Sequence, residues 1–247
     1  MSIPRIIHRI WIGSAPNDQQ IATLLDARLH IQGRVELWLW TTRSNRPRLP
    51  FTIDKNIVLR DLDTLWTESS IPSVPLAYLH SAFERERYGY YHNYAAASDI
   101  ARLLILYRHG GVYLDMDVSF REGAFDLFGD LRNIGQRLGM LGRHGHELMN
   151  AVLAAMPRAK APEKCLASIA CSYKQNPYSW DDKRGFLAPQ FFRVGMTLGM
   201  TGPGMIHKIL IQEGMLQGIP HHYFEQPDAS GTSFTTRPKI KRRDSLP

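Results

Sequence analysis

The sequence predicts a single layered α/β domain, and three observations carry this prediction. The chain has 247 residues, the length of one large domain. Hydrophobic residues make up 44% of the chain, which is enough to build a sizeable core. Short apolar, β-branched runs alternate with segments in which apolar residues recur every three or four positions, the pattern of strands that alternate with helices.

The first part of the chain predicts the order β, α, β, β, α. In chain order we expect a strand over residues 5–12, a helix over 21–29, strands over 35–40 and 56–60, and a helix over 76–87. The first strand ends at Gly13, and the last helix follows Pro75. This order favours a layered sheet with helices rather than a helical bundle.

The clearest helix is predicted from about Tyr94 to His109, because its apolar residues keep helical spacing until Gly110-Gly111 ends it. Residues 112–118 follow at once and predict a strand that becomes acidic at its end.

The remainder of the chain is less regular. We expect a loop over 120–143 and helices over 147–156, 163–174 and 204–216. No linker divides the chain, so one domain over residues 1–236 is expected, followed by a basic tail over 237–247.

Composition excludes several classes of protein. The net charge of +7 includes five basic residues in the tail, and the rest of the chain is too weakly basic for a nucleic-acid-binding surface. The tail itself is either a solvated segment or a contact for anionic surfaces. No apolar run is long enough to span a membrane, and no ordinary signal peptide is visible, so we expect a soluble protein. Cys165 and Cys171 alone make neither a disulfide framework nor a zinc site.

Two carboxylates mark the end of the predicted acidic strand. Asp115 and Asp117 are two residues apart, so on a strand they point to the same face. Paired carboxylates repel each other and favour a counter-cation, and oxygen ligands of this kind suit Mg²⁺ or Mn²⁺. The alternative is a solvated strand end with two acidic caps. Asp99 and Arg102, three residues apart on the preceding helix, share a face as either site residues or a local ion pair.

The stretch from Asn93 to Asp117, NYAAASDIARLLILYRHGGVYLDMD, resembles the sugar-nucleotide glycosyltransferases that carry a DXD motif. It is similar to the catalytic domains of large clostridial glucosylating toxins, to related bacterial effectors and to the DXD sugar-binding mannosyltransferase-type family. The opening segment IPRIIHRIWIG, residues 3–13, resembles the first strand of the same enzymes. The two segments lie in the first half of the chain, and the second half matches only loosely.

The resemblance implies a GT-A fold, a Rossmann-like domain with a mixed central sheet and added helices. It implies a UDP-sugar donor, with glucose or N-acetylglucosamine favoured, a Mn²⁺ or Mg²⁺ ion, and retention of configuration. The acceptor would be a protein side chain, as in toxin and effector enzymes, or alternatively a surface or lipid-linked glycan. Such a protein would act in the bacterial cytoplasm or be delivered into a host or target cell.

The resemblance also implies roles for individual residues. Asp117 would bind the metal directly, and Asp115 would contact both the metal and the donor. Asp99 and Arg102 would hold the donor sugar and its diphosphate. The remaining implied contacts are Ile10, Trp11 and Tyr113 for the nucleotide, Asn150 for the donor sugar, Glu147 for the acceptor and Ser233 for the metal.

Two other classes of function remain open. A non-catalytic protein could keep this fold to bind a partner, although intact Asp99, Arg102, Asp115 and Asp117 argue against a decayed site. A phosphotransferase or nuclease is disfavoured, because the further acidic cluster of a two-metal site is missing from the sequence. No Walker-type phosphate loop is present.

Overall fold

A mixed β-sheet of seven strands forms the centre of the protein. The computed structural model describes residues 2–14, 16–45, 57–67, 71–88, 93–122, 124–142, 148–175 and 197–225. Across these residues the strands follow the order β3-β2-β1-β4-β7-β6-β8, and β5 and β9 pair separately as a two-stranded ladder. The predicted α/β class is therefore confirmed.

The strands are β1 (Ile6–Trp11), β2 (Glu36–Thr41), β3 (Ile57–Asp61), β4 (Gly111–Leu114), β5 (Ser119–Phe120), β6 (Leu138–Gly142), β7 (Leu148–Ala155), β8 (Leu216–Ile219) and β9 (Phe224–Glu225). The helices are α1 (Asp18–Leu25), α2 (Ala27–His30), α3 (Leu76–Tyr88), α4 (Tyr94–His109), α5 (Leu127–Asp130), α6 (Lys160–Gln175) and α9 (Pro203–Leu210).

Four neighbouring strands run parallel. β3, β2, β1 and β4 pair in parallel, whereas β7 runs antiparallel to both β4 and β6. The carboxyl ends of the parallel strands therefore meet at one edge of the sheet, where open α/β sheets usually bind their ligands. Trp11, Thr41, Asp61 and Leu114 end these four strands.

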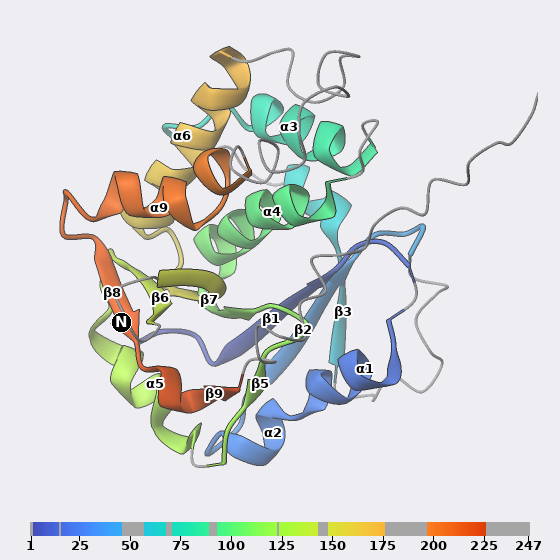
Figure 1. Ribbon diagram of the computed structural model, residues 1–247, viewed down its shortest axis with the longest axis vertical. Coiled ribbons are helices and arrows are strands. Elements are labelled where there is room, and N and C mark those ends of the chain that lie inside the picture. The colour runs from blue at the N-terminus through green and yellow to red at the C-terminus, as the bar shows by residue number, and fades with distance from the viewer. Residues whose placement is uncertain are drawn as a thin grey trace, which may run out of the picture.

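Helices cover both faces of the sheet. α3, α4, α6 and α9 pack as one layer, whereas α1 and α2 lie on the opposite side (Figure 1). α4 is the central helix of its layer, and eleven of its residues are buried, which explains its nearly continuous apolar sequence. Among the described residues, no helix is long and apolar enough to cross a membrane.

Helix α4 has the bounds that its sequence signals predict. The Asn93 side chain accepts a hydrogen bond from the Ala96 amide and caps the first turn. Gly110 ends the helix with a φ of 65°, a backbone conformation that favours glycine. A Cβ on Gly111 would lie only 2.6 Å from the Ile6 carbonyl oxygen, so glycine lets β4 approach β1 closely.

The predicted helix over residues 147–156 is wrong, because residues 148–155 form strand β7. Its apolar run fits a buried strand and a buried helix equally, and periodicity cannot distinguish them. These residues form a strand because they lie between β4 and β6, and β7 makes backbone hydrogen bonds with both neighbours.

Two further predictions differ from the structure, and a third is untested. The expected loop over 120–143 contains α5 and β6. The expected helix over 204–216 ends at Leu210, after which β8 pairs with β6. The boundary expected between residues 236 and 237 lies outside the described residues.

Candidate active site at the carboxyl edge of the sheet

Helix α4 carries the first two site residues on one buried face. Asp99 and Arg102 are 6% and 5% exposed, and Arg102 Nη2 lies 3.3 Å from Asp99 Oδ1. A buried ion pair of this kind needs further hydrogen bonds to offset the loss of water around both charges. The local ion pair and the shared site therefore are not alternatives, because the pair itself belongs to a larger network.

Two distant segments complete the surroundings of Asp99. Asn150 of β7 donates from Nδ2 to Asp99 Oδ1 over 2.8 Å, and Thr201 donates from Oγ1 to Oδ2 over 3.0 Å. Arg102 also donates from Nη1 to the Asn150 carbonyl over 2.7 Å. Burial raises the pKa of Asp99 to about 6, although Arg102 and both hydrogen bonds oppose the rise.

Asp115 joins the same network just after β4. The Tyr113 hydroxyl donates to Asp115 Oδ1 over 2.7 Å, and Arg102 Nη2 lies 3.1 Å from the same oxygen. The Arg102 guanidinium also covers the Tyr113 ring at 4.5 Å. Burial raises the pKa of Tyr113, so its hydroxyl stays protonated and keeps donating. Burial alone would lower the pKa of Arg102, but Asp115 and the other anionic groups outweigh it.

The acidic segment itself is a turn rather than a strand. β4 ends at Leu114, and the Val118 amide donates to the Asp115 carbonyl over 3.1 Å. The prediction of a strand over 112–118 is therefore wrong beyond Leu114. The turn gives the two carboxylates different surroundings: Asp115 is partly buried in the network, whereas Asp117 is exposed.

The nucleotide residues predicted on β1 lie beside this turn along the same sheet edge. Ile10 is buried, and Trp11 is partly buried, with its indole N–H donating to the Ser14 carbonyl over 2.6 Å. The Thr41 hydroxyl donates to the Trp11 carbonyl and joins the ends of β1 and β2. Ile10 therefore packs in the hydrophobic core, whereas part of the Trp11 side chain remains exposed at this edge of the sheet.

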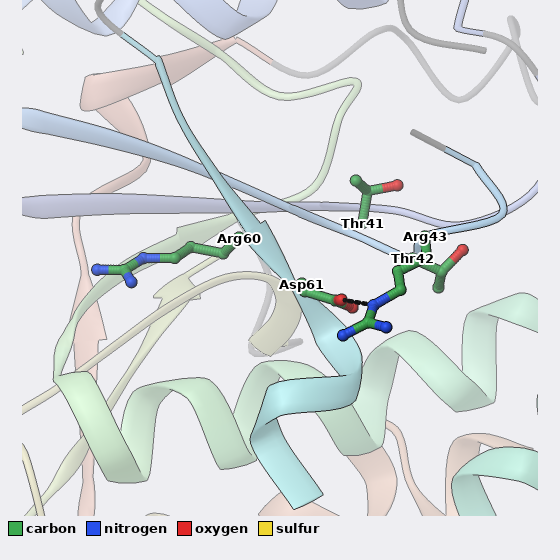
Figure 2. Close-up of a pocket in the computed structure, with 5 residues that line it drawn as sticks. All are labelled: Thr41, Thr42, Arg43, Arg60 and Asp61. Carbon is green, nitrogen blue, oxygen red and sulfur yellow. Dashed lines mark hydrogen bonds and ion pairs between the residues drawn. The ribbon is translucent and has the colours of Figure 1, made fainter. Parts of the chain in front are cut away.

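A small hollow continues this edge at the ends of β2 and β3. Thr41, Thr42, Arg43, Arg60 and Asp61 line it. Arg43 donates to Asp61 over 2.8 Å, whereas the Arg60 side chain extends away from this pair (Figure 2). Asp61 therefore neutralises Arg43 at this edge, whereas the Arg60 guanidinium lies over the Trp38 ring, 3.9 Å from its centroid.

Three residues that contact this network escaped the sequence interpretation. The Ser98 hydroxyl lies 3.3 Å from the Tyr113 hydroxyl and accepts from Arg102 over 3.2 Å. Thr201 donates to Asp99 from a position 102 residues further along the chain. Arg9 of β1, a charged residue inside an apolar strand, contacts the backbone of the acidic turn. That interruption of an apolar run was the signal that could have revealed it.

The donor set around Asp115 and Asp117 fits a hard divalent cation. Mg²⁺ and Mn²⁺ commonly take one or two protein carboxylates and complete their shell with phosphate and water. Within the described ranges, no group of three or more His, Cys, Asp or Glu side chains gathers as a closed metal site. Glu147 and Ser233, predicted for the acceptor and the metal, lie outside the described residues.

Comparison with known proteins agrees with this geometry. Residues 27–131 match the family described as the glycosyltransferase sugar-binding region containing a DXD motif. The predicted resemblance to DXD glycosyltransferases is therefore confirmed. The matched segment contains Asp99, Arg102, Tyr113, Asp115 and Asp117, so it includes most of the network. No curated protein sequence matches the chain.

Solved structures of toxin glycosyltransferases share the fold. The UDP-bound glycosyltransferase domain from the YGT toxin is 13% identical, with a TM-score of 0.66 over 94% of this chain and 82% of that chain. The PaToxG glycosyltransferase is 20% identical, with a TM-score of 0.57 over 86% and 70%. The catalytic domain of alpha-toxin from Clostridium novyi is 11% identical, with a TM-score of 0.53 over 93% and 76%. The segment that matches the DXD family thus lies in a GT-A-like fold that is shared with toxin glycosyltransferase domains.

Proposed function

We propose that the protein is a metal-dependent glycosyltransferase that moves a sugar from a UDP-sugar to a protein side chain. One observation carries the proposal: Asp99, Arg102, Asp115 and Asn150 form one hydrogen-bonded network at the carboxyl edge of the sheet. This network lies in and beside the segment that matches the DXD family.

The network offers both kinds of charge that transfer of a glycosyl group requires. Breaking the bond between sugar and phosphate leaves a nucleoside diphosphate with more negative charge. Arg102 remains cationic in the buried network and would face this charge on the diphosphate. Asp99 and Asn150 would hold hydroxyl groups of the donor sugar, and carboxylates nearby favour its oxocarbenium character.

Asp115 and Asp117 would hold the metal ion, and Trp11 would present its ring to the base of the nucleotide. A bound divalent cation supplies Lewis-acid stabilisation of the diphosphate that leaves. The hydrogen bond from Tyr113 and the ion pair with Arg102 both fix Asp115 Oδ1, which orients this carboxylate before any ligand binds. Within this proposal the metal contact of Ser233 and the acceptor role of Glu147 stay predictions.

The likeness to toxin glycosyltransferase folds supports the finer features of the proposal. The UDP-bound YGT domain favours UDP as the nucleotide, and the toxin relatives favour a protein acceptor over a glycan. We propose glucose or N-acetylglucosamine as the sugar and retention of configuration as the outcome.

Donor hydrolysis tests the proposal. The purified protein is incubated with Mn²⁺ and a panel of UDP- and GDP-sugars, and nucleotide release is followed beside Asp117→Ala. Asp117 is exposed, so its removal should leave the fold intact, and Glu122→Ala is the matched control for an exposed carboxylate nearby. Metal-dependent release of UDP that only Asp117→Ala abolishes is the expected result. No release, together with no calorimetric binding of UDP and Mn²⁺, would refute the proposal.

A further inference from the structure

Arg9 is a charged residue in the middle of a buried strand, and its side chain is only 3% exposed. Its guanidinium donates from Nη1 to the Asp115 carbonyl over 2.6 Å and from Nη2 to the Val118 carbonyl over 2.8 Å. One side chain thus holds the first and the last residue of the acidic turn. Because burial of a guanidinium is costly, such a position needs strong and specific compensation.

The turn depends on this support because the sheet holds only its first residue, through the Asp115 amide, which donates to the Ala151 carbonyl of β7 over 2.8 Å. β1 pairs with β4 only at Ile7–Val112 and His8–Tyr113, and β4 ends before the turn. Beyond this pairing, hydrogen bonds from side chains replace the backbone hydrogen bonds between β1 and β4. Thr23 of α1 donates from Oγ1 to the Met116 carbonyl over 2.8 Å.

Asp26 balances the charge of Arg9 and ties it to the far side of the turn. Its Oδ1 lies 3.4 Å from Arg9 Nη2, and its Oδ2 accepts from the Phe120 amide over 2.7 Å. Arg9 therefore can use its donors on the turn carbonyls without remaining an uncompensated buried charge. Arg102 reaches the Asp115 side chain, so the two arginines fix this residue through separate groups, its backbone and its carboxylate.

We infer that Arg9 is a positioning residue of the donor site, which clamps the Asp115–Val118 turn so that Asp115 and Asp117 present their carboxylates to a metal and diphosphate. This inference rests on the proposed function. A site with two protein carboxylates tolerates little error, because Mg²⁺ and Mn²⁺ sites demand defined ligand geometry. Arginine suits the task since its planar fork donates to the two carbonyls from two separate nitrogens in fixed directions, whereas a lysine would have to reach both from a single nitrogen.

Four variants separate the clamp from a general role in stability. Arg9→Met removes it, Arg9→Lys keeps the charge without the fork, and Thr23→Val removes one support while sparing the buried charge. The control is Arg87→Met, which removes an equally buried arginine whose ion pairs are with Asp63 and Glu84.

The measurement is the affinity for UDP by calorimetry, with and without Mn²⁺, beside the thermal midpoint of each variant. We expect Arg9→Met to reduce the enhancement of UDP affinity by Mn²⁺ about 10-fold or more, as outer residues of metal sites often do. Arg9→Lys should recover part of it, and Thr23→Val should lose a few-fold. Arg87→Met should lower the thermal midpoint yet keep the enhancement.

Amide hydrogen exchange gives a readout that needs no ligand. The Val118 amide donates to the Asp115 carbonyl inside the turn, so its exchange should be faster in Arg9→Met and Thr23→Val than in Arg87→Met. If the wild type fails to bind UDP with Mn²⁺, the proposed function is refuted. Hydrogen exchange at Val118 then tests by itself whether Arg9 holds the Asp115–Val118 turn. Equal exchange at Val118 in Thr23→Val, Arg87→Met and the wild type would overturn the inference, as would an unchanged Mn²⁺ enhancement in Arg9→Met.

Discussion

Replacing Asp99 with asparagine should stabilise the protein at neutral pH while it removes activity. The carboxyl group is buried, and burial raises its pKa from an ordinary 3.8 to about 6. Asparagine keeps the shape without the charge. The asparagine amide can donate to Thr201 Oγ1, and Thr201 Oγ1 can still donate to the Thr197 carbonyl 3.2 Å away. No buried polar group therefore has to lose its hydrogen-bond partner.

The magnitude follows from the pKa difference between the folded and the unfolded chain. Because the folded pKa is the higher one, the folded protein binds the extra proton between pH 3.8 and 6, and stability falls as the pH rises through this window. At about 1.4 kcal/mol for each pH unit, ionised Asp99 costs about 3 kcal/mol once the pH is above 6. For a chain of this length that corresponds to about 6–12 °C in the thermal midpoint.

Denaturant unfolding of Asp99→Asn and wild type between pH 4 and 8 measures this effect. The stability of the variant relative to wild type should grow with pH and level off above about pH 7. Glu122→Gln, at an exposed position, controls for the loss of one negative charge. A difference between Asp99→Asn and wild type that stays constant across this range would refute the reasoning, because it would show that the carboxyl group does not titrate differently in the folded protein.

Three further changes test other parts of the structure. Thr201→Val removes a donor to the ionised carboxylate, so it should cost about 1–2 kcal/mol at pH 8 and less at pH 4, measured by the same unfolding curves. Gly111→Ala adds a Cβ 2.6 Å from a carbonyl of β1 at a φ of 91°, and should lower the thermal midpoint by well over 5 °C. His8→Phe leaves the Trp40 indole N–H without its acceptor, which should cost about 1–3 kcal/mol at pH 7, again by denaturant unfolding.

The sequence predicts elements best where local signals are strong. α4 keeps its apolar periodicity until Gly110-Gly111 ends it, so its bounds follow from the chain alone. β7 has no such punctuation, and only its two neighbours in the sheet make it a strand. The strand conformation of β7 therefore depends on tertiary contacts and not on its local sequence.

The candidate site divides in the same way. Asp99 and Arg102 lie three apart on a helix, so their contact was predictable, and the acidic end of the predicted strand indicated Asp115 and Asp117. Asn150 and Thr201 both donate hydrogen bonds to Asp99, from 51 and 102 positions away in the sequence. No local sequence pattern predicts either contact. Side chains that support the site from a distance need the folded chain to reveal them.

Two buried groups make the pH dependence of stability informative about the whole fold. His8 accepts from Trp40 Nε1 and contacts the Gly110 carbonyl, and burial lowers its pKa to about 3. Between pH 4 and 6 the unfolded chain protonates this histidine and the folded protein does not, so its contribution rises with pH by about 1.4 kcal/mol per unit. Asp99 contributes an equal slope of opposite sign over the same range.

The contributions of His8 and Asp99 to the pH dependence of stability therefore cancel in the wild type, and each single substitution should expose the contribution of the remaining group. Relative to wild type, stability should rise with pH in Asp99→Asn and fall with pH in His8→Phe. If both variants instead kept the wild-type profile, neither group could be titrating as its burial requires.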